Sequence, residues 1–405
     1  MSKKLLRSVF RAFFVRRLKI FSYFCIRVGG VERRSLPTSM KLLKMNKIKL
    51  LALAALLLMG CATKQETTNN MKQQLTLTQE WDKTFAKSDK VEHRKVTFHN
   101  RYGIELAADL YLPVNAQAKL PAIAVSGPFG AVKEQSSGLY AQHMAERGFV
   151  ALAFDPSFTG ESGGEPRRVA SPDINTEDFL AAVDYLSVQD FVDPDRIGLI
   201  GICGFGGMAI NAAALDPRVK ATVASTMYDM SRVAREGYFG STNTPAARDE
   251  QRAAIARQRT DDYRNGTYAR AGGVVDPLPD DAPWFVKDYH AYYKTPRGFH
   301  PRSGNSTDGW NVTGTQSFIN QPLLSMAREI KTPVLLIHGE KAHSRYFSEG
   351  AFEQMTGVHV EGESKIVGNK ELMIIPNAVH TDLYDDLNNK IPYDKLEQFF
   401  AQNLK

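Results

Sequence analysis

Short apolar runs alternate with amphipathic stretches over much of the chain. The apolar runs are continuous, which is typical of strands buried on both faces of a sheet, and they occupy residues 120–126, 148–154, 196–202 and 219–225. The stretches between them carry apolar residues at helical spacing, as in residues 176–186, where Thr176 is a capping residue. Strands that alternate with helices predict an α/β protein whose mostly parallel sheet has helices on both faces.

The alternation begins with a hairpin and is interrupted once. Residues 95–98 and 104–112 alternate apolar and polar positions around Asn100–Gly103, which predicts two paired strands. Residues 230–330 are polar, rich in Arg and Asp, and dotted with Tyr and Trp, and they contain helical stretches but no buried strand. We interpret this segment as a mainly helical lid inserted between strands six and seven. Strands at 333–338 and 370–375 then complete an eight-stranded sheet, whose core comprises residues 91–229 and 331–405.

The N-terminal residues have the composition of a targeting segment. A basic stretch from Met40 leads into an apolar run and then Gly60-Cys61, so residues 40–60 indicate a secretory signal. Leu58–Cys61 resembles a bacterial lipobox, which implies that Cys61 is acylated and that residues 61–90 form a tether. This predicts a lipid-anchored protein of the bacterial cell envelope that faces the periplasm. A plain secretory signal, or a chance apolar stretch in a cytoplasmic protein, is the alternative. Residues 1–39 fit neither pattern and indicate a misplaced start codon or an extended signal.

Charge and cysteine content exclude several classes of function. The net charge of +7 belongs to the first 60 residues, because 37 basic and 43 acidic side chains remain from Cys61 onward. The folded part is therefore not a nucleic-acid-binding surface. Cys25 and Cys61 lie in the targeting segment, so Cys203 has no partner for a disulfide and is either inert or chemically active. Metal-ligand spacing and a phosphate-binding loop are both missing from the sequence, and we expect no cofactor.

The third apolar run leads directly into Cys203-Gly204-Phe205-Gly206-Gly207. Small residues before and after a nucleophile permit the tight strand-to-helix turn that exposes it. Such a turn places Cys203 at a helix N-terminus, which would lower the pKa of its thiol. It also directs the N–H of Gly204 toward the reacting atoms as an oxyanion donor.

From about Val91 onward the chain resembles an α/β hydrolase. Gly201–Gly207 is similar to the Gly-x-Cys-x-Gly-Gly motif of the dienelactone-hydrolase-like branch, in which the cysteine is the nucleophile. Residues 127–135, 196–207 and 339–344 also resemble uncharacterised bacterial hydrolases that are grouped with fungal polyketide acyltransferases. Many of these carry Ser where this chain has Phe205. On that alignment the nucleophile would be lost and Cys203 would be a small buried apolar residue.

The resemblance implies the rest of the site. His380 follows the last predicted strand, where the family has its general base. Glu340, in the loop after residues 333–338, would be the acid that orients it, and Asp229 is the alternative. The second oxyanion N–H would come from Phe129 or Gly130.

Two polar residues, His343 and Ser344, follow Glu340 closely and either face the substrate or belong to a loop without a role. These residues together predict hydrolysis or transfer of an acyl group from an ester, thioester or lactone, through an acyl-Cys203 intermediate. The expected partners are a small acyl substrate, held under the aromatic lid, and a membrane, reached through the N-terminal lipid. A lipid-anchored protein that binds a ligand without turnover is the alternative from another class.

Overall fold

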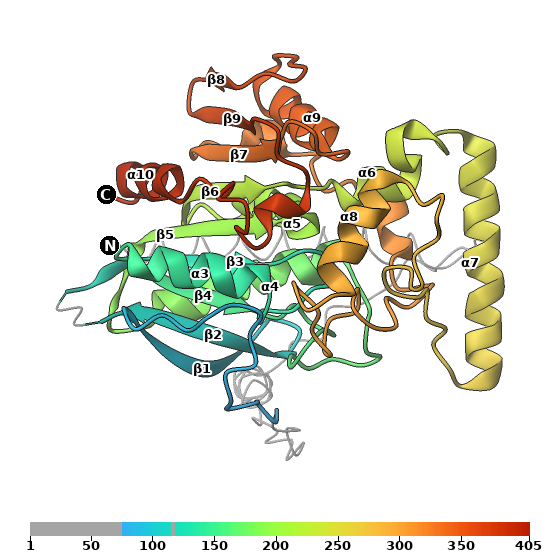
Figure 1. Ribbon diagram of the computed structural model, residues 1–405, viewed down its shortest axis with the longest axis horizontal. Helices are drawn as coiled ribbons and strands as arrows, with labels where there is room; N and C mark the ends of the chain where they lie inside the picture. Colours follow the sequence, from blue (N-terminus) through green and yellow to red (C-terminus); the bar gives the residue numbers. More distant parts are fainter. Residues whose placement is uncertain (1–74, 115–117) are drawn as a thin grey trace, which may run out of the picture. The chain divides into compact units, whose positions relative to one another are not determined.

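This computed structural model describes residues 75–114 and 118–405. Their fold is built around a nine-stranded sheet (Figure 1). Its strand order is β1-β2-β4-β3-β5-β6-β7-β9-β8. The strands are β1 (Val91–His99), β2 (Glu105–Pro113), β3 (Leu120–Ser126), β4 (Val150–Phe154), β5 (Val192–Ile202), β6 (Val219–Ser225), β7 (Val334–Gly339), β8 (Lys365–Val367) and β9 (Lys370–Ile375). The predicted leader, the lipid site at Cys61 and the stretch 1–39 lie outside the described residues.

Strands β3 to β7 and β9 are parallel, while β1, β2 and β8 pair antiparallel with their neighbours. The predicted hairpin is confirmed, with β1 and β2 joined through residues 100–104. The sequence missed β8, which is three residues long and largely exposed at the sheet edge. So short a strand has too few positions to show a hydrophobic period.

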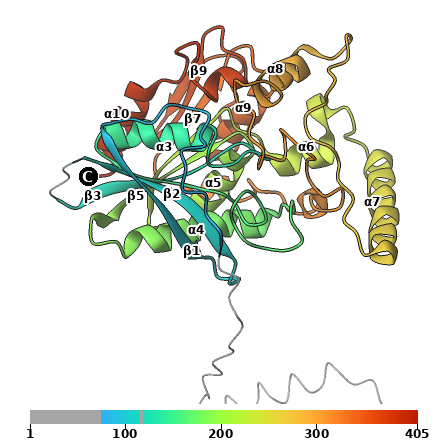
Figure 2. The ribbon, with the colours of Figure 1, turned by 60° about the horizontal axis from the view of Figure 1, so that its bottom comes forward.

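Helices cover both faces of the sheet (Figure 2). On one face lie α3 (Ser136–Glu146) and α10 (Tyr393–Asn403), and on the other lie α4 (Pro172–Ser187) and α5 (Gly204–Leu215). The helix α9 (Arg345–Thr356) packs on β7 and β9. Local signals fix the start of α4, because the Ser171 hydroxyl accepts a hydrogen bond from the N–H of Ile174 and Pro172 occupies the first turn. The arrangement confirms the α/β-hydrolase-type fold.

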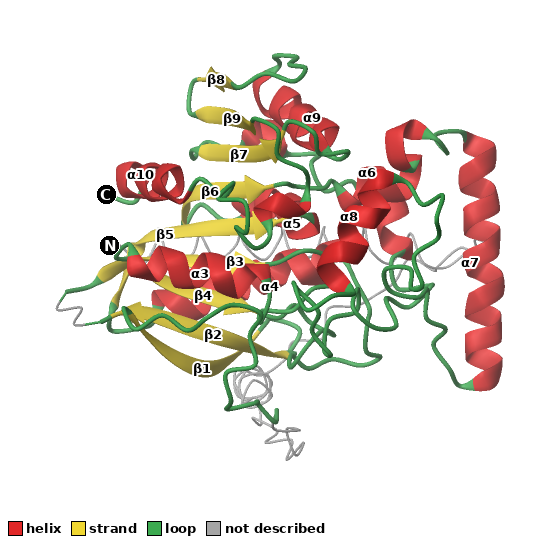
Figure 3. Cartoon of the chain, viewed as in Figure 1, coloured by secondary structure: helices red, strands yellow, loops and turns green. Residues whose placement is uncertain are grey.

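The insertion between β6 and β7 contains α6 (Met230–Glu236), α7 (Pro245–Asn265) and α8 (Trp284–Tyr293). Long loops connect these helices, so irregular segments make up more of the insertion than its sequence predicts (Figure 3). Helix α7 is rich in charged residues, and only Ile255 and Asp262 are buried in it. Among the described helices, none combines the length and the apolar character needed to cross a bilayer.

Residues 78–90 do not form a free tether, although the sequence predicts one. Lys83 forms a fully buried ion pair with Asp109 of β2 at 2.6 Å. The backbone N–H of Thr84 donates to the carbonyl of Glu134 at 3.0 Å, and Trp81 packs edge-on against His93. Asp109 is fully buried and also pairs with Lys95 of β1 at 3.5 Å, so Lys83 joins a buried group of charges that the sequence pattern does not reveal.

Candidate active site

Cys203 occupies the turn between β5 and α5. Its φ and ψ are 55° and −122°, a conformation that a non-glycine residue rarely adopts. The turn is tight, because a Cβ added at Gly201 would lie 2.2 Å from the carbonyl oxygen of Phe205. Strain of this kind concentrates at functional sites, where the surrounding fold holds it. The thiol is therefore at the apex of a strand-to-helix elbow, as the sequence predicts.

Phe205 does not compete with Cys203 for the apex. Its side chain is 1% exposed and packs on Phe179 of α4, with ring centroids 6.2 Å apart. Cys203 instead packs with the cluster of buried residues that contains Tyr228, Tyr293 and Tyr384. The two side chains leave the elbow toward different cores, so the large residue at 205 fills space under α4 and leaves the thiol where it is.

Two backbone N–H groups face the thiol of Cys203. They belong to Gly204, the first residue of α5, and to Phe129, in the loop after β3. The approach of the loop requires glycine at 204, because a Cβ there would lie 2.6 Å from the Cβ of Phe129. Two converging N–H groups beside a nucleophile form the arrangement that stabilises an oxyanion. The structure thus brings together the two residues named from sequence as donors, and their catalytic role remains a prediction.

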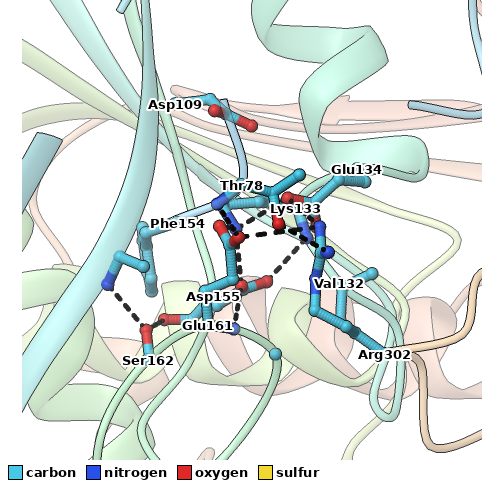
Figure 4. Close-up of polar contacts among 12 residues, drawn as sticks. Thr78, Asp109, Val132, Lys133, Glu134, Phe154, Asp155, Glu161, Ser162 and Arg302 are labelled. Carbon is cyan, nitrogen blue, oxygen red and sulfur yellow. Dashed lines mark hydrogen bonds and ion pairs between the residues drawn. The ribbon is translucent and has the colours of Figure 1, made fainter. Parts of the chain in front are cut away.

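A buried ion cluster anchors the loop that carries Phe129 (Figure 4). The Lys133 ammonium lies 2.7 Å from Glu134, 2.8 Å from Asp155 and 2.6 Å from Glu161. The three carboxylates lie close enough together to hold a metal ion. However, the ammonium already provides the positive charge at the centre of the group. Charge pairing keeps the pKa of the Lys133 ammonium well above its usual value despite the opposing effect of burial, which is the largest single influence.

The insertion reaches the same loop from the other side. Asn305 donates from its side chain to the carbonyl of Phe129 at 2.7 Å and from its backbone to the carbonyl of Gly130 at 3.1 Å. Arg302 pairs with Glu134 at 2.8 Å, and the Ser303 hydroxyl donates to Gly130 at 2.8 Å. The position of the Phe129 N–H therefore depends on contacts with the lid as well as on the sheet.

His380 is fully buried and belongs to a chain of hydrogen bonds. Its Nε2 lies 2.9 Å from the hydroxyl of Tyr384, a residue that lines the same cavity as Cys203 and neighbours its thiol. Its Nδ1 lies 2.6 Å from the hydroxyl of Ser344 and 2.8 Å from that of Thr226. The structure thus connects the two principal residues predicted from sequence, with a tyrosine between them.

Neither predicted acid contacts His380. Glu340 is exposed and accepts a hydrogen bond from the backbone N–H of Asn377 at 2.8 Å. Asp229 caps α6, where its carboxylate accepts hydrogen bonds from Ser231 and Arg232. The expectation that one of them orients His380 is therefore corrected: within residues 75–114 and 118–405, no carboxylate is hydrogen-bonded to that ring.

Hydroxyl groups stand where the acid was expected. Thr226 directly follows β6 and Ser344 lies in the loop after β7, so they occupy the two strand ends to which the sequence assigned Asp229 and Glu340. Ser344 also contacts Nε2 of His338 at 2.9 Å, and Nδ1 of that ring contacts the Ser348 hydroxyl at 2.7 Å. The sequence places Ser344 only four residues after Glu340, so it could have been considered as a partner of His380. Which of the two side chains faces inward depends on the direction in which the loop turns.

Burial sets the protonation states of the site. Desolvation raises the pKa of the Cys203 thiol to about 11, although hydrogen bonds from Tyr384, Gly204 and Phe129 act in the opposite direction. Desolvation likewise holds the pKa of His380 well below its usual value, and the neighbouring rings of His343 and His338 add to the effect. The resting site is a neutral thiol beside a neutral imidazole. Burial is the largest influence on the thiol pKa; the N–H of Gly204 at the helix start lowers this pKa, as the sequence predicts, but the net shift is upward.

The thiol opens into a cavity of about 240 Å³. Its aromatic walls come from the core and the insertion, and they consist of Phe129, Tyr228, Tyr238, Tyr289, Tyr293, Trp310 and Tyr384. In the part of the chain that the structure describes, none of the residues that line this cavity carries a charge. Tyr289, Tyr293 and Trp310 are among the aromatic residues that the sequence assigned to a lid, whereas Tyr263 and Tyr268 border a separate surface hollow.

The parallel sheet, the strained elbow and the histidine after the last strand define an α/β-hydrolase-type protein. Residues 102–380 match the model of the family described as X-Pro dipeptidyl-peptidase (S15 family), and the chain belongs to that family. Family membership supports a hydrolase and leaves the substrate open, because one fold serves many reactions.

Several known proteins are similar to this chain. The uncharacterized protein PA2218 of Pseudomonas aeruginosa is 56% identical over 361 residues, which cover 87% of this chain and 94% of that protein. Two fungal proteins match shorter stretches. Acyltransferase drtE of Aspergillus calidoustus is 34% identical over 40% of this chain and 52% of its own length. Thiohydrolase aneE of Aspergillus aculeatus is 38% identical over 32% of this chain and 39% of its own length.

Solved structures show the same fold. The crystal structure of PA2218 has a TM-score of 0.76 and 57% sequence identity, and the match covers 82% of this chain and 99% of that one. The α/β hydrolase GrgF from Penicillium has a TM-score of 0.61 at 20% identity, with 77% of this chain and 99% of that chain covered. The second likeness concerns the fold alone.

Proposed function

We propose that this protein hydrolyses or transfers the acyl group of an uncharged ester, thioester or lactone through an acyl-Cys203 intermediate, with His380 as the general base. One observation carries the proposal: the Cys203 thiol faces the cavity from the elbow apex, between two backbone N–H groups, and is linked through Tyr384 to a neutral imidazole. Nucleophile, oxyanion donors and base are the parts that acyl transfer requires.

The reaction would proceed in two stages. The sulfur attacks the acyl carbonyl while the thiol proton passes toward His380, and the N–H groups of Gly204 and Phe129 stabilise the oxyanion that forms. Collapse of the tetrahedral intermediate releases the alcohol or thiol, which takes up the proton. Water or an acceptor alcohol then attacks the thioester, with His380 accepting its proton. Because His380 is neutral at rest, it is able to accept a proton in each stage.

The cavity favours an acyl group without charge. Its lining of phenol, indole and aliphatic side chains offers apolar contact and a few hydroxyl groups. A dipeptidyl substrate of the kind that the family description names has a free amino group, and the charged ammonium would find no carboxylate among the lining residues. The names of the fungal relatives, an acyltransferase and a thiohydrolase, support an acyl-transfer reaction. We therefore favour esters and thioesters over peptides.

Mass spectrometry after brief exposure to p-nitrophenyl butyrate tests the proposal. We expect a butyryl adduct on Cys203, release of p-nitrophenol, and loss of both in Cys203→Ala. The variant should remain folded, since the thiol is replaced by a smaller side chain at the same elbow. Full turnover by folded Cys203→Ala would refute the acyl-cysteine mechanism. Turnover of an X-Pro p-nitroanilide by the wild-type protein, and not of the ester, would point to a peptidase.

Acyl transfer and hydrolysis differ only in the acceptor. The reacting atoms are almost dry, with Cys203 7% exposed and His380 fully buried, which favours an acceptor that brings its own hydroxyl group. Product analysis with short alcohols present distinguishes the two reactions, because a transferase forms the new ester at the expense of the free acid.

We also propose that the protein is exported and anchored to the cell envelope through acylated Cys61. The signal-like run at 40–60 and the lipobox-like Leu58–Cys61 support this. Incorporation of an alkyne-labelled fatty acid by the full chain, and its loss in Cys61→Ser, is the expected result. Unlabelled wild-type protein in the soluble fraction would refute it.

A further inference from the structure

We propose that Tyr384 is a catalytic residue that conducts the thiol proton of Cys203 to His380. The inference deepens the proposed function and rests on it. The observation behind it is the position of the Tyr384 hydroxyl, which lies 2.9 Å from Nε2 of His380 and beside the Cys203 thiol, in the wall of the same cavity. In the described residues the ring of His380 has no direct hydrogen bond to Cys203.

The fold holds the hydroxyl of Tyr384 in this position. His380 and Tyr384 lie at either end of η4 (Thr381–Leu383), a single helical turn in which the N–H of Tyr384 donates to the carbonyl of Thr381 at 3.0 Å. The two rings meet edge to face, with their centroids 5.2 Å apart. The ring of Tyr384 is 1% exposed and packs edge-on against Tyr292, with centroids 5.0 Å apart. A buried ring that is packed in this way has little freedom to leave the relay.

The proton balance is complete without any external group. As the S–C bond forms, the thiol proton moves to the oxygen of Tyr384 and the phenol proton moves to Nε2 of His380. For Nε2 to accept it, Nδ1 must carry the ring hydrogen and donate it to Ser344 or Thr226. When the C–O or C–S bond of the substrate breaks, the imidazolium returns its proton through Tyr384 to the leaving group. Tyr384 ends each half-reaction in the protonation state in which it began.

The surroundings favour a concerted transfer over a resting thiolate–imidazolium pair. The titratable side chains that face the thiol are Tyr384 and the cavity tyrosines Tyr228, Tyr238, Tyr289 and Tyr293. All of them are neutral at rest, because burial raises the pKa of each above its usual value. A separated ion pair would lack stabilising charges, so a proton that moves only as the S–C bond forms avoids that cost.

Tyr384→Phe removes the relay and keeps the ring. General acid–base groups contribute roughly 10²–10⁴-fold to rate, so we expect the burst of p-nitrophenol from p-nitrophenyl butyrate to slow by about 10²-fold or more. Tyr111→Phe is the matched control, since Tyr111 is fully buried and its hydroxyl has no hydrogen-bond partner among the described residues. The burst of the wild-type protein should depend on the D₂O fraction in a curved manner, because two protons move together. A burst in Tyr384→Phe with the wild-type rate and the same curve would overturn the relay.

Thiol alkylation by iodoacetamide gives a second measurement that needs no substrate. Loss of the Tyr384 hydrogen bond should move the alkylation midpoint of Cys203 to higher pH. Incorporation of 3-fluorotyrosine at position 384, which keeps the shape of the ring and strengthens the donor, should move it to lower pH. Unchanged midpoints in both proteins would also refute the relay, and the fluorinated protein keeps the test valid if Tyr384→Phe does not fold.

The outcomes separate this inference from the function on which it rests. Turnover by folded Cys203→Ala removes the acyl-cysteine mechanism, and the relay with it. An inactive Cys203→Ala together with a fully active Tyr384→Phe leaves the mechanism standing and removes the relay alone.

Discussion

Replacing Gly204 by alanine tests the oxyanion arrangement most directly. The added Cβ would lie 2.6 Å from the Cβ of Phe129, whereas ordinary contact begins near 3.4 Å, so the two backbones must separate by roughly 0.8 Å. The sulfur of Met230, at 3.1 Å from the same Cβ, belongs to a flexible side chain and moves more easily. The strain therefore falls on the loop that carries the Phe129 N–H.

That loop cannot shift without losing contacts. Asn305 holds the carbonyl of Phe129 at 2.7 Å, and the Phe129 ring packs on Trp310 with centroids 4.3 Å apart. A displacement of about 1 Å costs on the order of 10²-fold in rate, and loss of one oxyanion donor costs roughly 10²–10³-fold. We expect Gly204→Ala to slow acylation of Cys203 by about 10²-fold. Overpacking at the elbow should destabilise the fold by about 1–3 kcal/mol.

The assay is the burst rate with p-nitrophenyl butyrate, followed in a stopped-flow instrument, with urea unfolding measured alongside. Gly350→Ala is the matched control on a helix, because the first atom that its Cβ would meet is the guanidinium of Arg232, the mobile end of a long side chain. Acylation of folded Gly204→Ala at the wild-type rate would show that the N–H groups of Gly204 and Phe129 do not hold the oxyanion.

Three further predictions follow from the contacts around the site. Ser344→Ala should lower the acylation rate by about tenfold, because it removes a hydrogen bond that fixes the tautomer of His380. Glu340→Gln should leave the burst rate unchanged. Equal effects of the two substitutions would contradict the conclusion that hydroxyl groups, and not Glu340, orient His380. Lys133→Met should destabilise the fold by about 3–5 kcal/mol in urea unfolding, since it leaves buried carboxylates without their cation. A free energy of unfolding equal to that of the wild type would be inconsistent with the ion cluster. Burial opposes ionisation of Glu161, but its ammonium partners outweigh burial and hold its pKa at about 2 in the folded protein. Its contribution to stability is therefore complete above pH 4.5 and is lost as the pH falls toward 2. Urea midpoints that stay constant over this range, with Glu161→Gln as the reference, would argue against the pairing.

The sequence predicted the fold because its signals are local and repeated. Buried parallel strands need continuous apolar runs, and helices on both faces need apolar stripes, so β3 to β7 could be placed with few errors. The elbow was also predictable, since the glycines around Cys203 leave few other conformations for the chain. No such periodic signal marks the three-residue strand β8 or the docked segment 78–90.

The surroundings of His380 could not be predicted in the same way. A loop after a strand offers several polar residues, and the direction of one turn determines that Ser344 faces inward while Glu340 faces solvent. Tyr384 carried one usable signal, its position four residues after the histidine. The thiol pKa was missed for a different reason, because helix dipoles are visible in a sequence and depth of burial is not.

The high pKa of the Cys203 thiol has a consequence for the durability of the protein. Peroxides and disulfides react with thiolates and hardly at all with protonated thiols, and they need access to the sulfur. With a pKa of about 11 and only 7% exposure, Cys203 is shielded from both routes of oxidation. A thiol held in this way withstands oxidising surroundings without a reducing partner.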